Sequence, residues 1–327
     1  MLDYETDGIT QRTMAQIANA SITAVNRYIS AHNISPIDRA AQRYYKYSIE
    51  NVRNIVGALF TNEKKNIKNK RHAFYNFKGG TGKTSICFQV SSHVAMMGYN
   101  VLVIDADPQA HLSSSFGFLN DNDCLTLFDC LVGKRDISSI IHNIYPGLDC
   151  IPSNLSLTRL ESELNQMPKR EERIKFELSS IEDKYDFVFI DTNPTISILN
   201  RNIITYSDII NIICETQPYS LNGLKLLIED LNQFSYYMQM KSKILNIIPN
   251  KYEDRSNNSA EAMSALKTYY SSYLREDFAI RKSEDIITSS KIAKPLAFFA
   301  KKNSIALEDI IELVHYLIEI SLEGNKP

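Results

Sequence analysis

The stretch Arg71–Thr84, RHAFYNFKGGTGKT, decides the fold of this chain. It opens with a short apolar and aromatic run at 73–77, which has the length and composition of a β-strand. Gly79, Gly80 and Gly82 follow, and glycines allow a tight turn whose backbone N–H groups point inward at phosphate oxygens. The stretch therefore predicts a strand that leads into a phosphate-binding loop.

The end of this loop carries the side chains that a bound nucleotide needs. Lys83 supplies a cation for the phosphates, and the Thr84 hydroxyl is placed to ligate Mg²⁺ at the start of a helix. The general pattern G-x-x-x-x-G-K-[ST] requires glycine where this chain has Phe77. The loop instead carries a second lysine, Lys78. The sequence predicts a nucleotide site with two lysines.

Length and composition set the class of protein. The chain has 327 residues, of which 44% are hydrophobic and 23% charged, with a net charge of −2, so we expect a globular protein of about two domains. The acidic start MLDYETDG does not suit a signal peptide. Five cysteines without a C-x-x-C pair favour reduced thiols. We expect a cytoplasmic protein in which any affinity for DNA comes from local basic patches.

Two further strands are expected to end in carboxylates. The apolar run Val101–Ile104 suits a parallel strand buried on both faces, and it leads to Asp105 and Asp107. A second strand at 185–191 is aromatic and β-branched and ends in Asp191. Such strand ends form the ligand-binding edge of an α/β sheet, although the first two carboxylates would also suit a plain helix cap. The pattern predicts a doubly wound, mostly parallel α/β sheet with helices on both faces.

Several motifs resemble those of the ParA/MinD family of ATPases. The loop K-G-G-T-G-K-T at 78–84 resembles the deviant Walker A loop of this family, and D-A-D-P-Q at 105–109 resembles its D-x-D-P-Q motif. Later elements are similar in position, so the resemblance covers about residues 72–300. One departure is Asn193, where the family usually has proline.

The resemblance implies a Mg²⁺-dependent ATPase that forms a homodimer on ATP, with Lys78 reaching across the interface to the partner's nucleotide. It implies that Asp107 positions the attacking water and that Asp191 holds Mg²⁺ through water, with support from Asp105. The implied catalytic residues are Lys78, Lys83 and Asp107, and the implied metal-binding residues are Thr84, Asp105 and Asp191. The implied nucleotide-binding residues are Lys78, Gly79, Gly80, Thr81, Gly82, Lys83, Thr84, Ser85, Asn250 and Arg281.

Residues 1–61 read as a separate small helical domain. A first amphipathic helix is followed by a break, in which Ser21 is the expected N-cap of a second helix. This is helix-turn-helix spacing, and the second helix exposes Thr23, Asn26 and Arg27 for contacts with DNA bases or phosphates. The region resembles the winged-helix N-terminal domain of the larger ParA proteins, which implies binding to one operator and autoregulation. A helical hairpin used only for dimer contacts is the alternative.

The basic segment 62–71 reads as a linker, and 72–327 as the ATPase domain. The chain up to residue 71 has a local charge of +5, against −7 for the rest. The stretch 275–302 has seven basic and four acidic side chains, and we expect it to bind DNA phosphates without regard to sequence, unless it is an ordinary solvated face. Its candidate contacts are Lys291, Lys294, Lys301 and Lys302.

The last helix separates two branches of the family. A MinD-like protein could use such a helix as a membrane anchor. Here its polar positions are acidic, and anionic lipids would repel them, so we expect the apolar stripe to pack on the sheet and no membrane to be bound. The stripe consists of Leu307, Ile310, Ile311, Val314, Leu317 and Ile318.

These features predict an ATP-dependent DNA-partitioning ATPase of the nucleoid, stimulated by a ParB-like centromere-binding partner. A MinD-like division-site ATPase is the alternative that the acidic last helix disfavours. An iron–sulfur reductase would need a cysteine soon after Asp191, and the nearest is Cys214. A transcription regulator that binds ATP only as a signal is a third alternative, and the presence of both Lys78 and Asp107 favours turnover instead.

Overall fold

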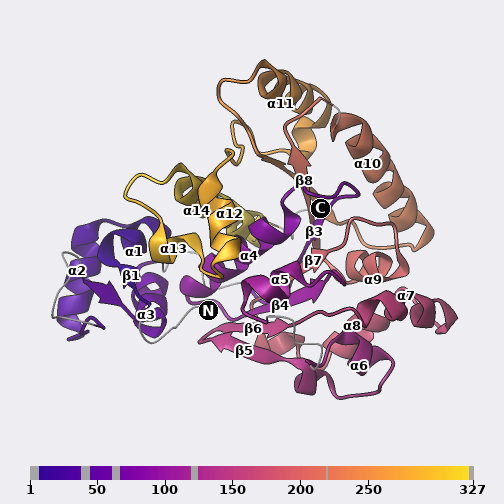
Figure 1. Cartoon of the computed structure of the whole chain (residues 1–327), viewed down its shortest axis with the longest axis horizontal. Helices are drawn as coiled ribbons and strands as arrows, with labels where there is room; N and C mark the ends of the chain where they lie inside the picture. Colours follow the sequence, from indigo (N-terminus) through magenta and orange to yellow (C-terminus); the bar gives the residue numbers. More distant parts are fainter. Residues whose placement is uncertain (1–6, 38–44, 61–66, 119–123, 219, 324–327) are drawn as a thin grey trace.

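The computed structural model of the chain describes residues 7–37, 45–60, 67–118, 124–218 and 220–323. Within these residues, a seven-stranded sheet forms the centre of the molecule, in the order β5-β6-β4-β7-β3-β8-β9 (Figure 1). All neighbouring strands are parallel except β5 and β6, which pair antiparallel at one edge. The strands are β3 (Lys70–Tyr75), β4 (Val101–Ala106), β5 (His142–Tyr145), β6 (Leu148–Ile151), β7 (Phe187–Thr192), β8 (Ile209–Glu215) and β9 (Ile244–Asn250).

Helices cover both faces of this sheet, and each face has its own apolar cluster. One cluster joins α4, α13 and α14 to the sheet, and the other joins the helices α6 to α10 to the opposite face. The helices after β3 are α4 (Lys83–Met96), α5 (His111–Ser115), α6 (Leu127–Leu131), α7 (Leu157–Gln166), α8 (Arg173–Leu178), α9 (Ile198–Tyr206), α10 (Ser220–Tyr237), α11 (Asn257–Tyr270), α12 (Glu284–Lys291), α13 (Leu296–Phe299) and α14 (Ile305–Glu323). The predicted fold class, a doubly wound and mostly parallel sheet, is confirmed.

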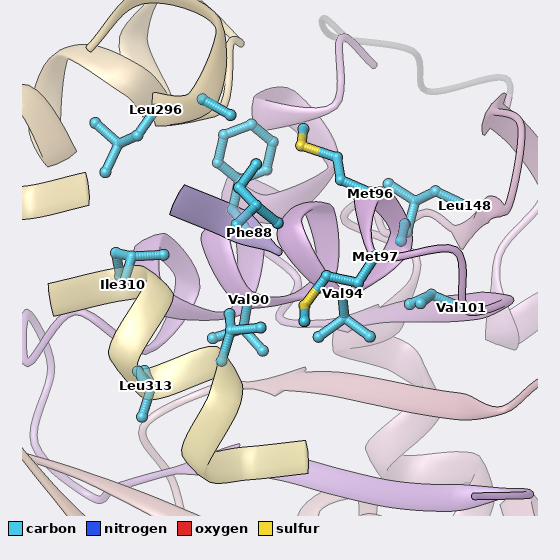
Figure 2. Packing of buried hydrophobic residues seen from close by; sticks show 14 of the residues in the cluster. Phe88, Val90, Val94, Met96, Met97, Val101, Leu148, Leu296, Ile310 and Leu313 are labelled. Carbon is cyan, nitrogen blue, oxygen red and sulfur yellow. The ribbon is translucent and has the colours of Figure 1, made fainter. Parts of the chain in front are cut away.

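The helix that follows the glycine-rich loop, α4, is the most enclosed of the long helices. Twelve of its fourteen residues are buried, because the sheet, α14, α12 and the N-terminal helix α3 all pack on it. Figure 2 shows Val90 of α4 beside Ile310 and Leu313 of α14, with Val94 and Met97 nearby. Its polar side chains, such as Gln89 and His93, are buried together with its apolar ones, so α4 is fixed in position by its surroundings.

A small helical unit precedes the sheet. It consists of β1 (Ile9–Thr10), α1 (Gln11–Ile17), α2 (Ile22–Ala31), β2 (Lys46–Tyr47) and α3 (Ile49–Leu59), with β1 and β2 paired antiparallel. The expected N-cap is confirmed, because the Ser21 side chain accepts a hydrogen bond from the backbone N–H of Ala24 at 3.1 Å. Val25 and Ile29 of α2 are buried, and its opposite side is exposed.

The N-terminal unit packs directly on the rest of the molecule. Its apolar residues belong to the same cluster as those of α4 and α14, and Figure 1 shows its indigo helices beside the gold helices α13 and α14. Arg53 of α3 donates hydrogen bonds to the carbonyl oxygens of Ala95, at 2.5 Å, and Tyr99, at 2.8 Å, at the C-terminal end of α4. His315 of α14 bonds the carbonyl oxygen of Ile17 at 2.9 Å.

The boundary between the two parts differs in detail from the expected linker. Strand β3 begins at Lys70, so the last two residues of the range 62–71 belong to the sheet. Ile67 is 3% exposed and joins the apolar cluster. Residues 62–66 lie outside the described part of the chain. The strand ends at Tyr75, two residues before the expected end, because the loop already begins at Asn76.

The last helix packs as predicted. Leu307, Ile310, Val314, Leu317 and Ile318 of α14 are buried, and Ile311 is partly buried against the same cluster. None of the helices in the described ranges is long and apolar enough to cross a bilayer.

A buried polar contact also fixes α14 against the sheet. Burial lowers the pKa of His72 in β3 to about 3, so the ring is neutral. Asn211 of β8 donates to His72 Nδ1 at 3.2 Å, which leaves Nε2 to donate to the Ser321 hydroxyl at 2.9 Å. Buried polar groups that are satisfied in this way specify one arrangement of helix and sheet.

Replacing one isoleucine of α14 with alanine tests whether this helix is part of the core. Ile310 is 0% exposed, so Ile310→Ala should lower the free energy of unfolding by about 2–5 kcal/mol through lost burial and a cavity. Ile305, in the first turn of the same helix, is 47% exposed, and Ile305→Ala should cost less than about 1 kcal/mol. Denaturant unfolding of both variants measures the difference. Equal costs would mean that α14 is peripheral.

Candidate nucleotide-binding site

The glycine-rich loop connects β3 to α4 at the carboxyl edge of the sheet. Gly80 and Gly82 have positive φ angles of 75° and 98°, which other residues adopt only with strain. Gly82 is also the N-cap of α4, and a Cβ atom at this position would lie 2.4 Å from the side-chain nitrogen of Asn250. Because of both constraints, the backbone of the loop can curl around a ligand at the N-terminus of α4, where free N–H groups favour an anion.

Lys83 lies under this loop. Its side chain is 6% exposed, and Nζ donates to the carbonyl oxygen of Lys78 at 3.4 Å. Burial lowers the pKa of Lys83, whereas the nearby charges of Asp191 and Asp107 raise it. The ammonium group therefore sits between the loop and the carboxylates, where it can bind the phosphate of a nucleotide.

Asp105 and Asp191 lie side by side on neighbouring strands, in register between β4 and β7. Both are 0% exposed. Burial raises the pKa of Asp105 to about 6, and burial followed by the charge of Asp105 raises the pKa of Asp191 well above its ordinary value. The N–H and hydroxyl groups of Ser113 donate to Asp105 at 2.8 and 2.7 Å, which partly stabilises its charge.

The arrangement around Asp191 fits a magnesium ion. The Thr84 hydroxyl donates to one oxygen of Asp191 at 2.6 Å, while the other oxygen, Oδ1, is buried without a hydrogen-bond partner in the described residues. A buried and unpaired carboxylate oxygen is costly unless a cation satisfies it. Two carboxylates and a hydroxyl are a small ligand set, and Mg²⁺ commonly uses one or two carboxylates together with water and phosphate oxygens.

Asp107 lies next to these groups but is more open to solvent. Its carboxylate accepts a hydrogen bond from the N–H of Gln109 at 2.9 Å, and its carbonyl oxygen accepts one from the Ser153 hydroxyl at 2.6 Å. The bond to Ser153 fixes the backbone, whereas the side chain is half-buried and can reach a ligand on the solvent side. Sequence reasoning missed Ser113, which follows the D-A-D-P-Q motif in a run of three serines, and Ser153, because a serine by itself carries no functional signal.

The segment after Asp191 is braced by side chains. Asn200 of α9 donates to Asn193 Oδ1 at 2.7 Å and to the carbonyl oxygen of Thr195 at 2.6 Å. Thr195 also donates to Asn193 Oδ1 at 2.6 Å. The asparagine that replaces the usual proline thus holds the segment through hydrogen bonds, where a proline would restrict its backbone.

Asn250 and Arg281, the last two residues expected to bind nucleotide, have different surroundings. Asn250, at the end of β9, is 5% exposed and donates to the carbonyl oxygen of Thr81 at 2.7 Å, so it contacts the loop directly. The Arg281 guanidinium is paired with Asp309 of α14 at 2.5 Å. The structure therefore brings Asn250 to the site, whereas the recorded contacts of the Arg281 side chain are with the last helix.

Lys78 and two residues that sequence reasoning missed form a charged group beside the loop. Lys78 Nζ lies 2.5 Å from one oxygen of Glu215, and Lys251 Nζ lies 2.7 Å from the other. The two residues that sequence reasoning missed are Glu215, which ends the parallel strand β8, and Lys251, which directly follows the parallel strand β9. This position at the ligand-binding edge was the sequence signal that could have identified them.

The expected DNA contacts are partly available. Thr23, Asn26 and Arg27 are all exposed on one side of α2. In the stretch 275–302, several basic side chains are already paired: Arg275 with Glu312, Arg281 with Asp309, Lys282 with Glu253 and Lys294 with Asp7. Lys291, Lys301 and Lys302 are exposed and have no ion pair within the described ranges. The free positive charge of this stretch is therefore smaller than its composition implies.

Substituting alanine for glycine tests the geometry of the loop. Gly82→Ala should lower the free energy of unfolding by about 1–3 kcal/mol, because it adds left-handed strain and a clash with Asn250. Gly223 in α10 is a matched control with no atom near the added Cβ, so Gly223→Ala should raise stability by up to about 1 kcal/mol. Denaturant unfolding measures both changes. Similar effects of the two substitutions would contradict the described loop.

Comparisons with known proteins agree with this site. A family model described as an AAA domain matches residues 69–245. The cell division protein PomZ of Myxococcus xanthus is 30% identical over 76% of this chain and 78% of its own length. The chromosome partitioning protein ParA of Caulobacter vibrioides is 27% identical over 70% of this chain and 87% of its own.

Solved structures share the fold. A complex of Cyanothece McdA(D38A) with ATP covers 76% of this chain and 96% of its own, with a TM-score of 0.69 and 21% identity. A plasmid partition protein from Borrelia burgdorferi bound to AMPPNP covers 76% and 98%, with a TM-score of 0.64 and 23% identity. With its two-lysine loop and paired strand-end carboxylates, the chain belongs to the ParA/MinD family of P-loop ATPases.

Proposed function

We propose that this protein is an ATP-dependent DNA-partitioning ATPase. The observation that carries the proposal is the convergence of Lys83, Thr84, Asp105 and Asp191 at one edge of the sheet, with a buried oxygen of Asp191 left for a cation. Family membership and relatives with partitioning roles support the cellular process.

The residues of the site have separate roles in this proposal. The loop from Lys78 to Ser85 binds the phosphates of ATP through its N–H groups and Lys83, and Asn250 borders the same loop. Thr84, Asp105 and Asp191 would hold Mg²⁺. When bound, this ion would neutralise negative charge on the phosphates. Asp107, the more exposed carboxylate, orients the attacking water, which makes it the residue most specific to turnover.

Family membership supports the proposed assembly and partners. ATP would bring two protomers together, and Lys78 would then bind the partner's phosphates and stabilise charge in the transition state. The dimer would bind DNA without regard to sequence through Lys291, Lys301 and Lys302, and a ParB-like partner would trigger hydrolysis. Lys294 contributes less to DNA binding in this proposal, since its ammonium already pairs with Asp7 at 2.6 Å. The protein would be located on the nucleoid, in the cytoplasm.

The N-terminal unit is proposed as a reader of one DNA site. The short turn between α1 and α2, the buried Val25 and Ile29, and the exposed Thr23, Asn26 and Arg27 support a helix-turn-helix arrangement with α2 as the recognition helix. Binding there would let the protein regulate its own operator. A MinD-like role is less well supported, because the apolar stripe of α14 is occupied by the core.

Two alanine variants separate binding from turnover. Lys83→Ala removes the buried cation below the loop and should abolish detectable ATP binding. Asp107→Ala keeps the loop and should bind ATP with affinity within about threefold of the unchanged protein, while hydrolysis falls by at least about 100-fold. Nucleotide titration and phosphate release measure the two properties. Normal hydrolysis by Asp107→Ala would contradict its proposed role.

A second pair of variants tests whether the N-terminal unit binds a specific DNA site. Arg27 is exposed on α2, and a base-edge contact from it would contribute about 1–3 kcal/mol of discrimination, so Arg27→Ala should weaken binding to the upstream operator by about 5- to 150-fold. Arg135→Ala changes an exposed arginine far along the chain and should leave binding unaltered. Footprinting on the upstream DNA compares them. Equal protection by both variants would favour the dimer-contact role for this unit.

A further inference from the structure

Glu215 lies between two lysines, beside the glycine-rich loop. One of its oxygens is 2.5 Å from Lys78 Nζ, and the other is 2.7 Å from Lys251 Nζ. Ser220, at the start of α10, also accepts from Lys78 at 3.3 Å. A single carboxylate therefore neutralises two cations that come from two different loops.

The lysines are also tied to the phosphate loop itself. Lys78 is part of this loop, and Lys251 Nζ donates to the carbonyl oxygen of Gly80 at 2.5 Å. Lys251 follows Asn250, which holds the carbonyl oxygen of Thr81, so the end of β9 contacts two consecutive peptide groups of the loop. The backbone of Lys251 is left-handed, with φ 57°, at the point where β9 has ended.

Burial differs between the carboxylate and its partners. The Glu215 side chain is 14% exposed, whereas those of Lys78 and Lys251 are 48% and 42% exposed. Burial by itself would raise the pKa of Glu215, but its hydrogen bonds to Lys251 and Lys78 outweigh this and lower it. The carboxylate is therefore fixed and charged at neutral pH, while the two ammonium groups reach solvent and can change partners.

We propose that Glu215 is an internal anion that occupies Lys78 and Lys251 until a nucleotide arrives. The inference rests on the proposed binding of nucleotide phosphates at this loop. Before any dimer forms, the phosphates of a nucleotide in the same protomer carry more charge than one carboxylate and attract the same two ammonium groups, so they compete with Glu215 for them. In the proposed ATP dimer, Lys78 would then turn to the partner's phosphates. Glu215 is in this sense a positioning residue that lowers nucleotide affinity by pairing with the two lysines.

Replacing this carboxylate with an amide should therefore strengthen nucleotide binding. Glu215→Gln keeps the size of the side chain but frees both lysines, and the affinity for ADP with Mg²⁺ should increase about two- to tenfold, as expected for two partly exposed ion pairs. ADP is used so that dimerisation does not contribute, and calorimetric titration measures the dissociation constant. A merely structural role would give the opposite sign, because damage to the loop weakens binding.

The same substitution elsewhere is the control. Glu253 pairs with Lys282 at 2.9 Å, and Glu253→Gln should leave the affinity for ADP unchanged. Removal of any negative charge near the site could also strengthen ADP binding. The effect of Glu215→Gln is therefore also measured in a variant that lacks Lys251. In a Lys251→Met background, Glu215→Gln should increase affinity by less than about twofold, because one of its two ion pairs is already absent.

The outcomes separate the inference from the proposed function. An equal gain with and without Lys251 would show simple charge repulsion and overturn the inference. So would unchanged or weaker binding of ADP by Glu215→Gln when the unchanged protein binds ADP well. Failure of the unchanged protein to bind any nucleotide would instead overturn the proposed function, and the inference with it.

Discussion

The burial of two carboxylates side by side is the constraint on which the rest of this structure depends. Asp105 and Asp191 are enclosed on adjacent parallel strands, and each makes the other harder to ionise. The fold partly offsets this through the Ser113 donors, the Thr84 hydroxyl and the buried ammonium of Lys83. One oxygen of Asp191 keeps no partner within the described residues. A protein region arranged in this way is stabilised when a cation and a phosphate arrive together.

The enclosed helix α4 connects this site to the remainder of the molecule. Its first turn carries Lys83 and Thr84, and further along, the side chain of Gln89 bonds Ser289 of α12 at 2.5 Å and the N–H of Leu296 in α13 at 3.1 Å. Its last carbonyl groups accept from Arg53 of the N-terminal unit. A rotation or shift of the first turn on nucleotide binding would thus be opposed, or transmitted, by contacts along the entire helix.

Much of the fold and the site could be predicted because the informative residues are local in sequence. The glycines and lysines of the loop stand together, and Asp105, Asp107 and Asp191 end apolar strands, so their convergence follows from the rule for parallel sheets. Other features depend on contacts between distant residues. The pairing of Glu215 with Lys78 spans 137 positions, and the pairing with Asp309 of Arg281, which position alone assigns to the nucleotide, joins residues of different elements. The paired lysines and arginines of 275–302 make a similar point. A count of charges along the sequence overstates the free positive charge of a surface, because the acidic neighbours of each side chain are not visible in it.

The continuous core between the N-terminal unit and α14 limits how this protein could have gained or could lose that unit. Removing it would leave the end carbonyls of α4 without the Arg53 guanidinium and would bring the apolar side of the cluster into water. The two parts therefore share one apolar core, although the proposed function gives specific DNA binding to one of them and ATP binding to the other. A shortened version of this chain, whether made by evolution or by design, should lose stability unless polar residues replace the apolar side of α14 that the N-terminal unit covers.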